Sequence, residues 1–192
     1  MIKAVIFDCF GVLVREGWFA FLDDYFAHDD HKRQQAIDGM SRMGAGLIGH
    51  DEFIAELAEL AGISYQQTED ILTDNPCDDK LFSYIEHNLK GHYKIGMLSN
   101  AGADRTEELF GGERVKLFDE IVLSYQVGMV KPDPAIYELI AHRLGVTPSE
   151  CLFIDDQERY CIAAENVGMK SIRHADINTD ATVVAMKELL HA

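Results

Sequence analysis

Side chains with the chemistry needed to attack phosphorus follow short apolar runs in this chain. They comprise a carboxylate, a hydroxyl, an ammonium and an acidic pair: Asp8, Ser99, Lys131, Asp155 and Asp156. A carboxylate that attacks phosphorus forms a covalent intermediate, which divides one difficult displacement into two easier ones. Three neighbouring carboxylates repel one another unless a cation lies among them, and an all-oxygen site favours magnesium. These residues therefore predict magnesium-assisted attack by Asp8 on phosphorus.

The apolar runs have the length and composition of buried strands. Ile2–Phe7 is continuously apolar apart from Lys3, as expected of a strand that is covered on both faces of a sheet. Four further strands are predicted at Tyr93–Leu98, Glu120–Leu123, Cys151–Ile154 and Lys170–Ile172. Helices are predicted at Asp104–Phe110, Ala135–Leu144, Glu158–Val167 and Thr179–Leu190. This alternation predicts an α/β fold with a doubly wound parallel sheet, in which the polar strand ends meet at one crevice.

Residues 15–88 have a different pattern, with apolar residues at helical spacing and no convincing strand. Phe53, Ile54 and Leu57, for example, form one apolar stripe that Gly62 would end. We therefore predict an α/β core formed by residues 1–14 and 89–192, and a helical insert formed by residues 15–88. A length of 192 residues is sufficient for one well-buried core with such an insert.

The composition is that of a globular protein, with 47% hydrophobic and 26% charged residues. The formal net charge of −16 argues against nucleic acid and anionic membranes as partners. We expect a small phosphorylated substrate, which local groups such as Lys131 would bind despite the negative net charge of the chain. The expected oligomeric state is a monomer or a homodimer. Neither a signal peptide nor a membrane span is predicted, because the first apolar run is short and no run approaches about 18 residues. The spacing of the four cysteines also shows no disulfide framework. We therefore expect a cytoplasmic protein.

The motifs, in their order, resemble those of the haloacid dehalogenase (HAD) superfamily. The resemblance covers about residues 1–14 and 90–175, and four segments carry it: the run ending in Asp8, Ser99-Asn100, Lys131-Pro-Asp-Pro134 and Phe153-Ile-Asp-Asp156. The pattern is most similar to that of phosphatase-like members with a small helical cap, so the insert would be this cap. The resemblance implies a HAD-like, Rossmann-type core and hydrolysis through an aspartyl-phosphate at Asp8.

The resemblance also implies how the phosphate is held. Ser99 matches the phosphate-binding position of the family, with Asn100 beside it. Lys131 would neutralise both the Asp8 carboxylate and the phosphate as a compact point charge. Within the insert, Arg15 is the predicted substrate contact because it stands next to the first motif.

For the metal, the resemblance implies ligands from two segments of the chain. Magnesium would be held by Asp8, the backbone carbonyl of Phe10 and the acidic pair. Asp156 would be the direct ligand, while Asp155 would orient it or bind through water. Relatives often carry Asn where Tyr160 stands, so the surroundings of the metal are expected to differ in this chain, with Gln157 or Glu158 able to compensate.

Phe10 departs from the pattern of active phosphatases, which carry a second Asp there as general acid and base. Losing such a group costs about 10²–10⁴-fold in rate. Three interpretations follow: substrates with good leaving groups such as acyl or anomeric sugar phosphates, a proton supplied by the cap, or slow turnover in a phosphate-binding or regulatory protein. An aromatic residue here also resembles the metal-free 2-haloacid dehalogenases, but Asp155 and Asp156 argue against that chemistry. We expect a magnesium-dependent phosphatase of a small metabolite.

Overall fold

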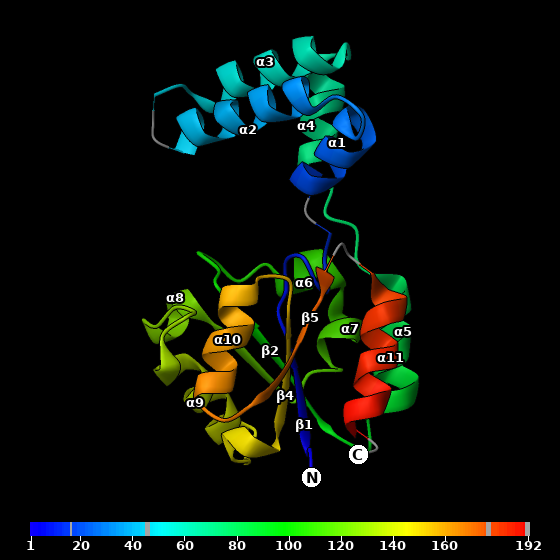
Figure 1. Cartoon of the computed structure of the whole chain (residues 1–192), viewed down its shortest axis with the longest axis vertical. Coiled ribbons are helices and arrows are strands. Elements are labelled where there is room, and N and C mark those ends of the chain that lie inside the picture. Colours follow the sequence, from blue (N-terminus) through cyan, green and yellow to red (C-terminus); the bar gives the residue numbers. More distant parts are fainter. Residues whose placement is uncertain (16, 45–46, 176–177, 191–192) are drawn as a thin grey trace. The chain divides into compact units, whose positions relative to one another are not determined.

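The computed structural model describes residues 1–15, 17–44, 47–175 and 178–190, and the chain forms two compact units (Figure 1). The core unit consists of Met1–Val14 and Cys77–Ala192, and the insert unit consists of Arg15–Pro76. Among the described helices, none has the length and apolar character needed to cross a membrane.

A five-stranded parallel sheet forms the centre of the core unit, in the order β3-β2-β1-β4-β5. Its strands are β1 (Ala4–Phe7), β2 (Lys94–Ser99), β3 (Glu120–Leu123), β4 (Cys151–Asp155) and β5 (Lys170–Arg173). The central strand β1 pairs with β2 and β4, so that Phe7 lies opposite Met97 on one side and Ile154 on the other. The predicted doubly wound α/β fold is confirmed. The strand order reverses beside β1, which is where such sheets bind ligands.

Helices cover both faces of this sheet (Figure 1). Successive strand residues point to opposite faces, and because the strands have buried apolar residues at successive positions, each face has side chains that pack against helices. Val5 and Phe7 pack on the side of α5 (Asp79–Tyr84), α6 (Thr106–Phe110), α7 (Gly112–Val115) and α11 (Thr179–Leu190). Ala4 and Ile6 pack on the side of α9 (Pro134–Arg143) and α10 (Glu158–Asn166). The shorter elements are α8 (Ser124–Val127), a π-helical turn (Ile85–Leu89) and a 3₁₀ turn (Pro148–Glu150).

The boundary of the insert differs from the prediction. The predicted insert ended at residue 88, whereas the insert unit ends at Pro76. The segment between these positions contains α5, whose Leu81 and Phe82 are buried in the same cluster as Phe7 of the central strand. Its helical periodicity is real, but periodicity does not reveal whether an apolar stripe packs on the sheet or on other helices.

The insert unit is helical, with α1 (Gly17–Phe26), α2 (Asp30–Gly44), α3 (His50–Ala61) and α4 (Tyr65–Thr73). It has an apolar core of its own that includes Phe21, Phe53 and Leu57. The α3 helix ends at Gly62, whose φ of 73° places it in the left-handed region that glycine adopts without strain.

Candidate active site

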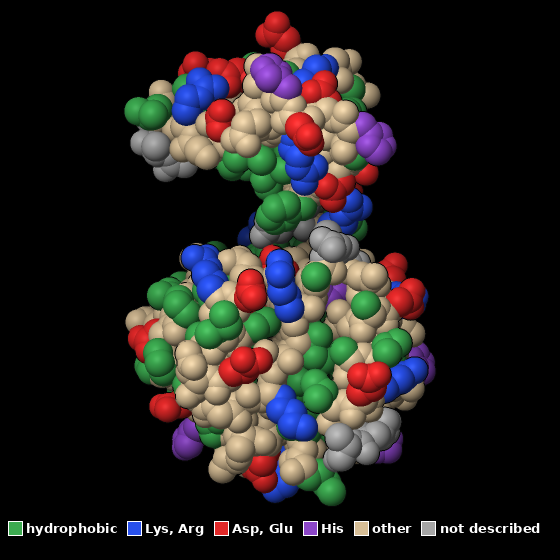
Figure 2. Space-filling view, in the orientation of Figure 1, with side chains coloured by type: hydrophobic (Ala, Val, Ile, Leu, Met, Phe, Trp, Pro, Cys, Tyr) green, Lys and Arg blue, Asp and Glu red, His purple; other side chains and the backbone are tan. Residues whose placement is uncertain are grey.

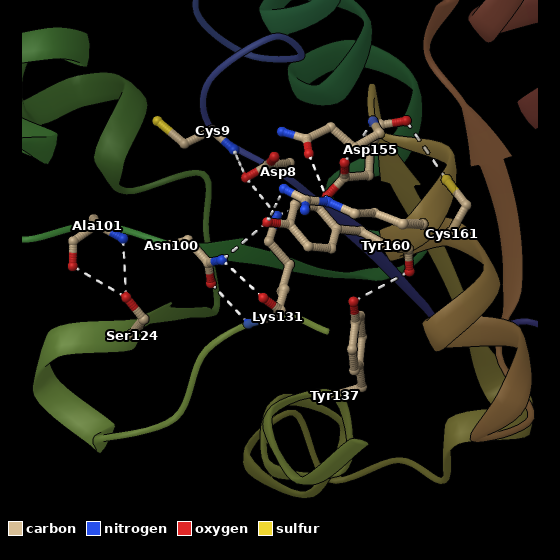
Figure 3. Close-up of polar contacts among 12 residues, drawn as sticks. Asp8, Cys9, Asn100, Ala101, Ser124, Lys131, Tyr137, Asp155, Tyr160 and Cys161 are labelled. Atoms are coloured by element: carbon tan, nitrogen blue, oxygen red, sulfur yellow. Dashed lines mark hydrogen bonds and ion pairs between the residues drawn. The ribbon is translucent and has the colours of Figure 1, made fainter. Parts of the chain in front are cut away.

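Asp8 is the first residue after β1, and its backbone N–H donates to the carbonyl oxygen of Ile154 at 2.9 Å. Its side chain is buried at the carboxyl edge of the sheet (Figure 3). Oδ1 accepts from the Cys9 backbone N–H at 2.7 Å and lies 2.9 Å from Lys131 Nζ. Oδ2 has no hydrogen-bond partner among the described residues. One carboxylate oxygen is therefore held in place by two contacts, and the other is held by none in the described part of the chain.

Lys131 places a positive charge between the first motif and the acidic pair. Its Nζ lies 2.9 Å from Asp8 Oδ1 and 2.6 Å from Asp155 Oδ2, and its side chain is 1% exposed. Burial lowers the pKa of Lys131, but the attraction of the two carboxylates outweighs burial and raises the pKa overall. The Tyr160 ring, 4.8 Å from Nζ, adds a cation–π contact. The ammonium is therefore charged and fixed.

Asp155 and Asp156 are adjacent but have different surroundings. Asp155 is fully buried, and its two oxygens are occupied: Oδ1 accepts from the Gln157 N–H at 2.8 Å, and Oδ2 accepts from Lys131. Asp156 Oδ1 is buried without a hydrogen-bond partner in the described part of the chain. Gly11 packs against this carboxylate so closely that a Cβ there would lie 2.7 Å from Asp156 Cγ. The loop after β1 therefore lies directly against the acidic pair.

Three carboxylates in this region have the arrangement of a cation site. One oxygen from each of Asp8, Asp155 and Asp156 lies within 4.8 Å of the others. Burial raises the pKa of Asp8 to about 7 against the opposing effect of Lys131, and the charge of Asp155 adds to the rise. Burial and Asp155 also raise the pKa of Asp156 to about 6. Three carboxylates outnumber one ammonium and Asp156 keeps an unpartnered oxygen, so the residues fit a hard divalent cation such as magnesium.

Asn100 holds the backbone of Lys131 in place. Its Oδ1 accepts from the Lys131 N–H at 2.8 Å, and its Nδ2 donates to the Lys131 carbonyl oxygen at 3.0 Å (Figure 3). Nδ2 also lies 3.3 Å from Tyr160 Oη. The predicted contact of Asn100 with the substrate stays a prediction, and the structure shows its amide bound to the segment that positions the lysine. Tyr160 completes this support, a role that the sequence did not indicate.

Ser99 ends β2 and lines a cavity of about 220 Å³ together with Cys9, Phe10 and Ala101. The loop that follows is fixed by Ser124, whose Oγ accepts from the Ala101 N–H at 3.0 Å and donates to the Ala101 carbonyl oxygen at 3.1 Å. These two hydrogen bonds fix the loop that follows Ser99 at the edge of the cavity. The role of Ser124 could not be predicted from the sequence, because Ser124 lies 23 residues from Ala101 in the short helix α8.

The side chains of two predicted site residues, Phe10 and Arg15, form no hydrogen bond or ion pair with other described residues. Phe10 adds an apolar ring to the cavity beside Ser99 and brings no titratable group to it. Arg15 belongs to the insert unit, and its Nε is buried without a hydrogen-bond partner among the described residues. Its predicted contact with the substrate stays a prediction.

Comparison with known proteins agrees with this geometry. The sequence profile of the haloacid dehalogenase-like hydrolases matches residues 2–168. This chain belongs to that family. A D-ribitol-5-phosphate phosphatase from Bacteroides thetaiotaomicron is 28% identical to this HAD-like hydrolase, and the alignment covers 96% of this chain and 98% of the relative.

Two solved structures support the assignment. A HAD-family enzyme from Bacteroides thetaiotaomicron, in complex with magnesium and inorganic phosphate, is 28% identical with a TM-score of 0.53, over 90% of this chain and 94% of that one. A predicted HAD-like family hydrolase from Porphyromonas gingivalis is 26% identical with a TM-score of 0.62, over 100% of this chain and 99% of that one. This HAD-like hydrolase is therefore similar along nearly its whole length to enzymes of the family.

Proposed function

We propose that this HAD-like hydrolase is a magnesium-dependent phosphatase that acts on a small metabolite through an aspartyl-phosphate at Asp8. The observation that carries the proposal is the buried cluster in which Lys131 bridges Asp8 and Asp155 while Asp156 keeps an unpartnered oxygen. The similarity to a sugar-alcohol phosphatase and to an enzyme crystallised with magnesium and phosphate supports the same chemistry.

In the first step, Asp8 Oδ2 attacks phosphorus while Oδ1 stays bound to the Cys9 N–H and Lys131. The bond from phosphorus to the leaving-group oxygen breaks, and its electron pair goes to that oxygen, which takes up a proton from water. In the second step, water attacks the phosphorus of the aspartyl-phosphate. The bond between phosphorus and Asp8 then breaks, which releases inorganic phosphate and restores the carboxylate.

The surrounding residues have separate tasks in this scheme. Lys131 neutralises charge on Asp8 and on the phosphoryl oxygens, and Ser99 with the loop that Ser124 fixes holds those oxygens. A magnesium ion bound at the carboxylates would neutralise the transferring phosphoryl group and fix in-line geometry. Its ligands would be Asp8, the Phe10 carbonyl and Asp156.

Asp155 is better suited to orient this site than to ligate the metal directly. Both of its oxygens are already occupied, by Lys131 and by the Gln157 N–H. Asp156, in contrast, has a buried oxygen without a partner. This difference supports Asp156 as the direct ligand and Asp155 as the residue that positions Lys131. The insert unit would serve as the cap, with Arg15 as a substrate contact.

Phe10 sets the expected substrate class because it has no proton to give. Substrates whose leaving groups need little protonation, such as acyl phosphates and anomeric sugar phosphates, should react fastest. The same residue favours the second candidate, a protein that binds phosphate for regulation and turns it over slowly. The two candidates share the anion and metal site and differ in whether a phosphoryl group is released.

Phosphate release from a panel of sugar, nucleotide and acyl phosphates, with and without magnesium, tests the proposal. An Asp8→Asn variant is the control, and Asp79→Asn serves as the matched carboxylate change because Asp79 is exposed in a surface pair with Arg114. We expect magnesium-dependent release that Asp8→Asn abolishes and Asp79→Asn retains. If no compound is hydrolysed but magnesium with beryllium fluoride raises the melting temperature, the binding role replaces the phosphatase.

A further inference from the structure

Most arginines of this acidic chain are neutralised by a carboxylate. Five of the eight form such pairs, namely Arg33, Arg42, Arg105, Arg114 and Arg143. Among the described residues, Arg159 and Arg173 of the core unit have no carboxylate partner, although the chain has a net charge of −16. Both are anchored to the loop that carries the acidic pair, and within the described part of the chain they are cations without a carboxylate partner beside the candidate active site.

Arg159 is held by contacts that fix its guanidinium without neutralising it. Its Nε donates to Gln157 Oε1 at 3.0 Å, and its Nη2 donates to Tyr160 Oη at 2.9 Å. The guanidinium carbon also lies 4.6 Å from the centre of the Tyr160 ring. Nη1 has no hydrogen-bond partner among the described residues. The group is therefore oriented in advance, with donors left for an acceptor outside the protein.

The anchor of Arg159 is itself part of the site. The Tyr160 ring covers Lys131 Nζ at 4.8 Å, and Tyr160 Oη lies 3.3 Å from Asn100 Nδ2. Lys131 in turn lies 2.9 Å from Asp8 Oδ1. A continuous series of contacts therefore connects the exposed guanidinium to the nucleophile.

Arg173 approaches the acidic pair from the neighbouring strand. It ends β5, where it lies opposite Asp155 in the register of the sheet, and its Nε donates to the Asp156 carbonyl oxygen at 3.2 Å. Its side chain is exposed. Figure 2 shows basic side chains, with acidic side chains between them, at this end of the core unit. Arg159 and Arg173 are therefore held by consecutive segments of one loop, through Gln157 and Asp156.

We propose that Arg159 and Arg173 form a second anion subsite, which binds a carboxylate or a second phosphate carried by the phosphorylated substrate. The inference rests on the proposed phosphatase function and narrows its substrate to doubly anionic metabolites. Guanidinium groups bind carboxylate and phosphate through paired, charge-assisted hydrogen bonds, which are stronger than those between neutral groups. Because the global field repels anions, two local cations without carboxylate partners would select such substrates.

Matched substrates that differ in one anionic group test the subsite. Glucuronic acid 1-phosphate and glucose 1,6-bisphosphate would each be compared with glucose 1-phosphate, which separates a carboxylate from a second phosphate. The readout is the ratio of kcat/KM for the doubly charged compound to that for glucose 1-phosphate. The variants are Arg159→Gln, Arg173→Gln and the double change, and Arg143→Gln, which loses a surface pair with Glu120, is the control.

We expect the ratio to favour at least one doubly charged compound and to fall about tenfold for each arginine removed, with no change in Arg143→Gln. A ratio near one in the unchanged protein, or a ratio that survives in the double variant, would overturn the subsite. Calorimetric binding of the same compounds to Asp8→Asn protein, with and without the arginines, gives a readout that needs no turnover. If no compound is hydrolysed, the phosphatase function fails. The subsite is then overturned separately if the doubly charged compounds bind Asp8→Asn protein with the same affinity whether or not the two arginines are present.

Discussion

Each end of the core sheet has a lysine paired with carboxylates, but the surroundings of the two lysines are opposite. At the amino end, Lys3 pairs with Glu150, and their side chains are 59% and 24% exposed. At the carboxyl end, Lys131 is 1% exposed between Asp8 and Asp155. Water screens the first pair, whereas the second loses its hydration and recovers little net stability. We therefore infer that the buried cluster serves the chemistry of the site rather than the stability of the fold, whereas the exposed pair is a solvated surface ion pair.

The largest difference between the two ends should appear in turnover. Asp8→Asn removes the nucleophile and keeps the size of the side chain, so we expect kcat to fall by about 10³-fold or more. Glu150→Gln changes a carboxylate at the opposite end of the sheet and should leave kcat unchanged. The measurement is phosphate release from the preferred compound of the panel. Equal losses in the two variants would contradict the distinction between the ends.

A smaller but clear difference should appear in stability. Lys131→Met leaves buried carboxylates without their counter-charge, and we expect a loss of about 3–5 kcal/mol in the free energy of unfolding. Lys3→Met removes only an exposed partner of Glu150 and should leave the urea midpoint nearly unchanged. Urea unfolding without magnesium checks both. If Lys131→Met unfolds at the same urea concentration as the unchanged protein, the buried carboxylates do not depend on Lys131 as their counter-charge.

The support of Lys131 should be measurable on its own. Asn100→Ala removes two hydrogen bonds to the Lys131 backbone, so we expect a loss of about 1–3 kcal/mol together with a lower kcat. Asn75→Ala removes one exposed hydrogen bond in the insert unit and should change neither quantity appreciably. Urea unfolding and phosphate release on the same samples would show both effects. A normal kcat in Asn100→Ala would argue that the lysine needs no such support.

The last expected effect is a pH dependence of the magnesium-free protein. The pKa of Asp8 is raised from 3.8 to about 7, and that of Asp156 from 3.8 to about 6. The folded state therefore binds protons at these carboxylates more tightly than the unfolded state does. This difference stabilises the folded state fully below about pH 4, and the stabilisation is lost as the pH rises towards 7. Magnesium competes with these protons, so the rise in melting temperature that it causes should be larger at pH 8 than at pH 5.5. A rise that is independent of pH would contradict the shared site.

The elements of the fold could largely be predicted because local composition determines them. The continuous apolar run before Asp8 predicted the central strand, and the polar residues after the strands were expected at one edge of the sheet. The end of the insert could not be located, since the apolar stripe of α5 has the same spacing whether it packs on a sheet or on helices.

The site was predictable to the extent that its residues follow strands. Asp8, Lys131 and the acidic pair were expected together and lie together. The contacts that support Lys131 could not be predicted, because they join residues that are distant in the sequence. Asn100 binds the backbone of Lys131, 31 residues away, and the Tyr160 ring lies over the Lys131 ammonium only in the folded chain. Nor could the surroundings of Arg159 be predicted, since only the folded chain shows that its guanidinium has no carboxylate partner among the described residues.

Trapping of the intermediate tests the central claim most directly. The protein would be mixed with magnesium and the preferred phosphorylated compound, quenched in acid, digested and analysed by mass spectrometry, beside Asp8→Asn. We predict a phosphoryl group on the peptide that contains Asp8, and its absence in the variant. Hydrolysis that proceeds with no label on that peptide, or with the label on another residue, would contradict the assignment of Asp8 as the nucleophile.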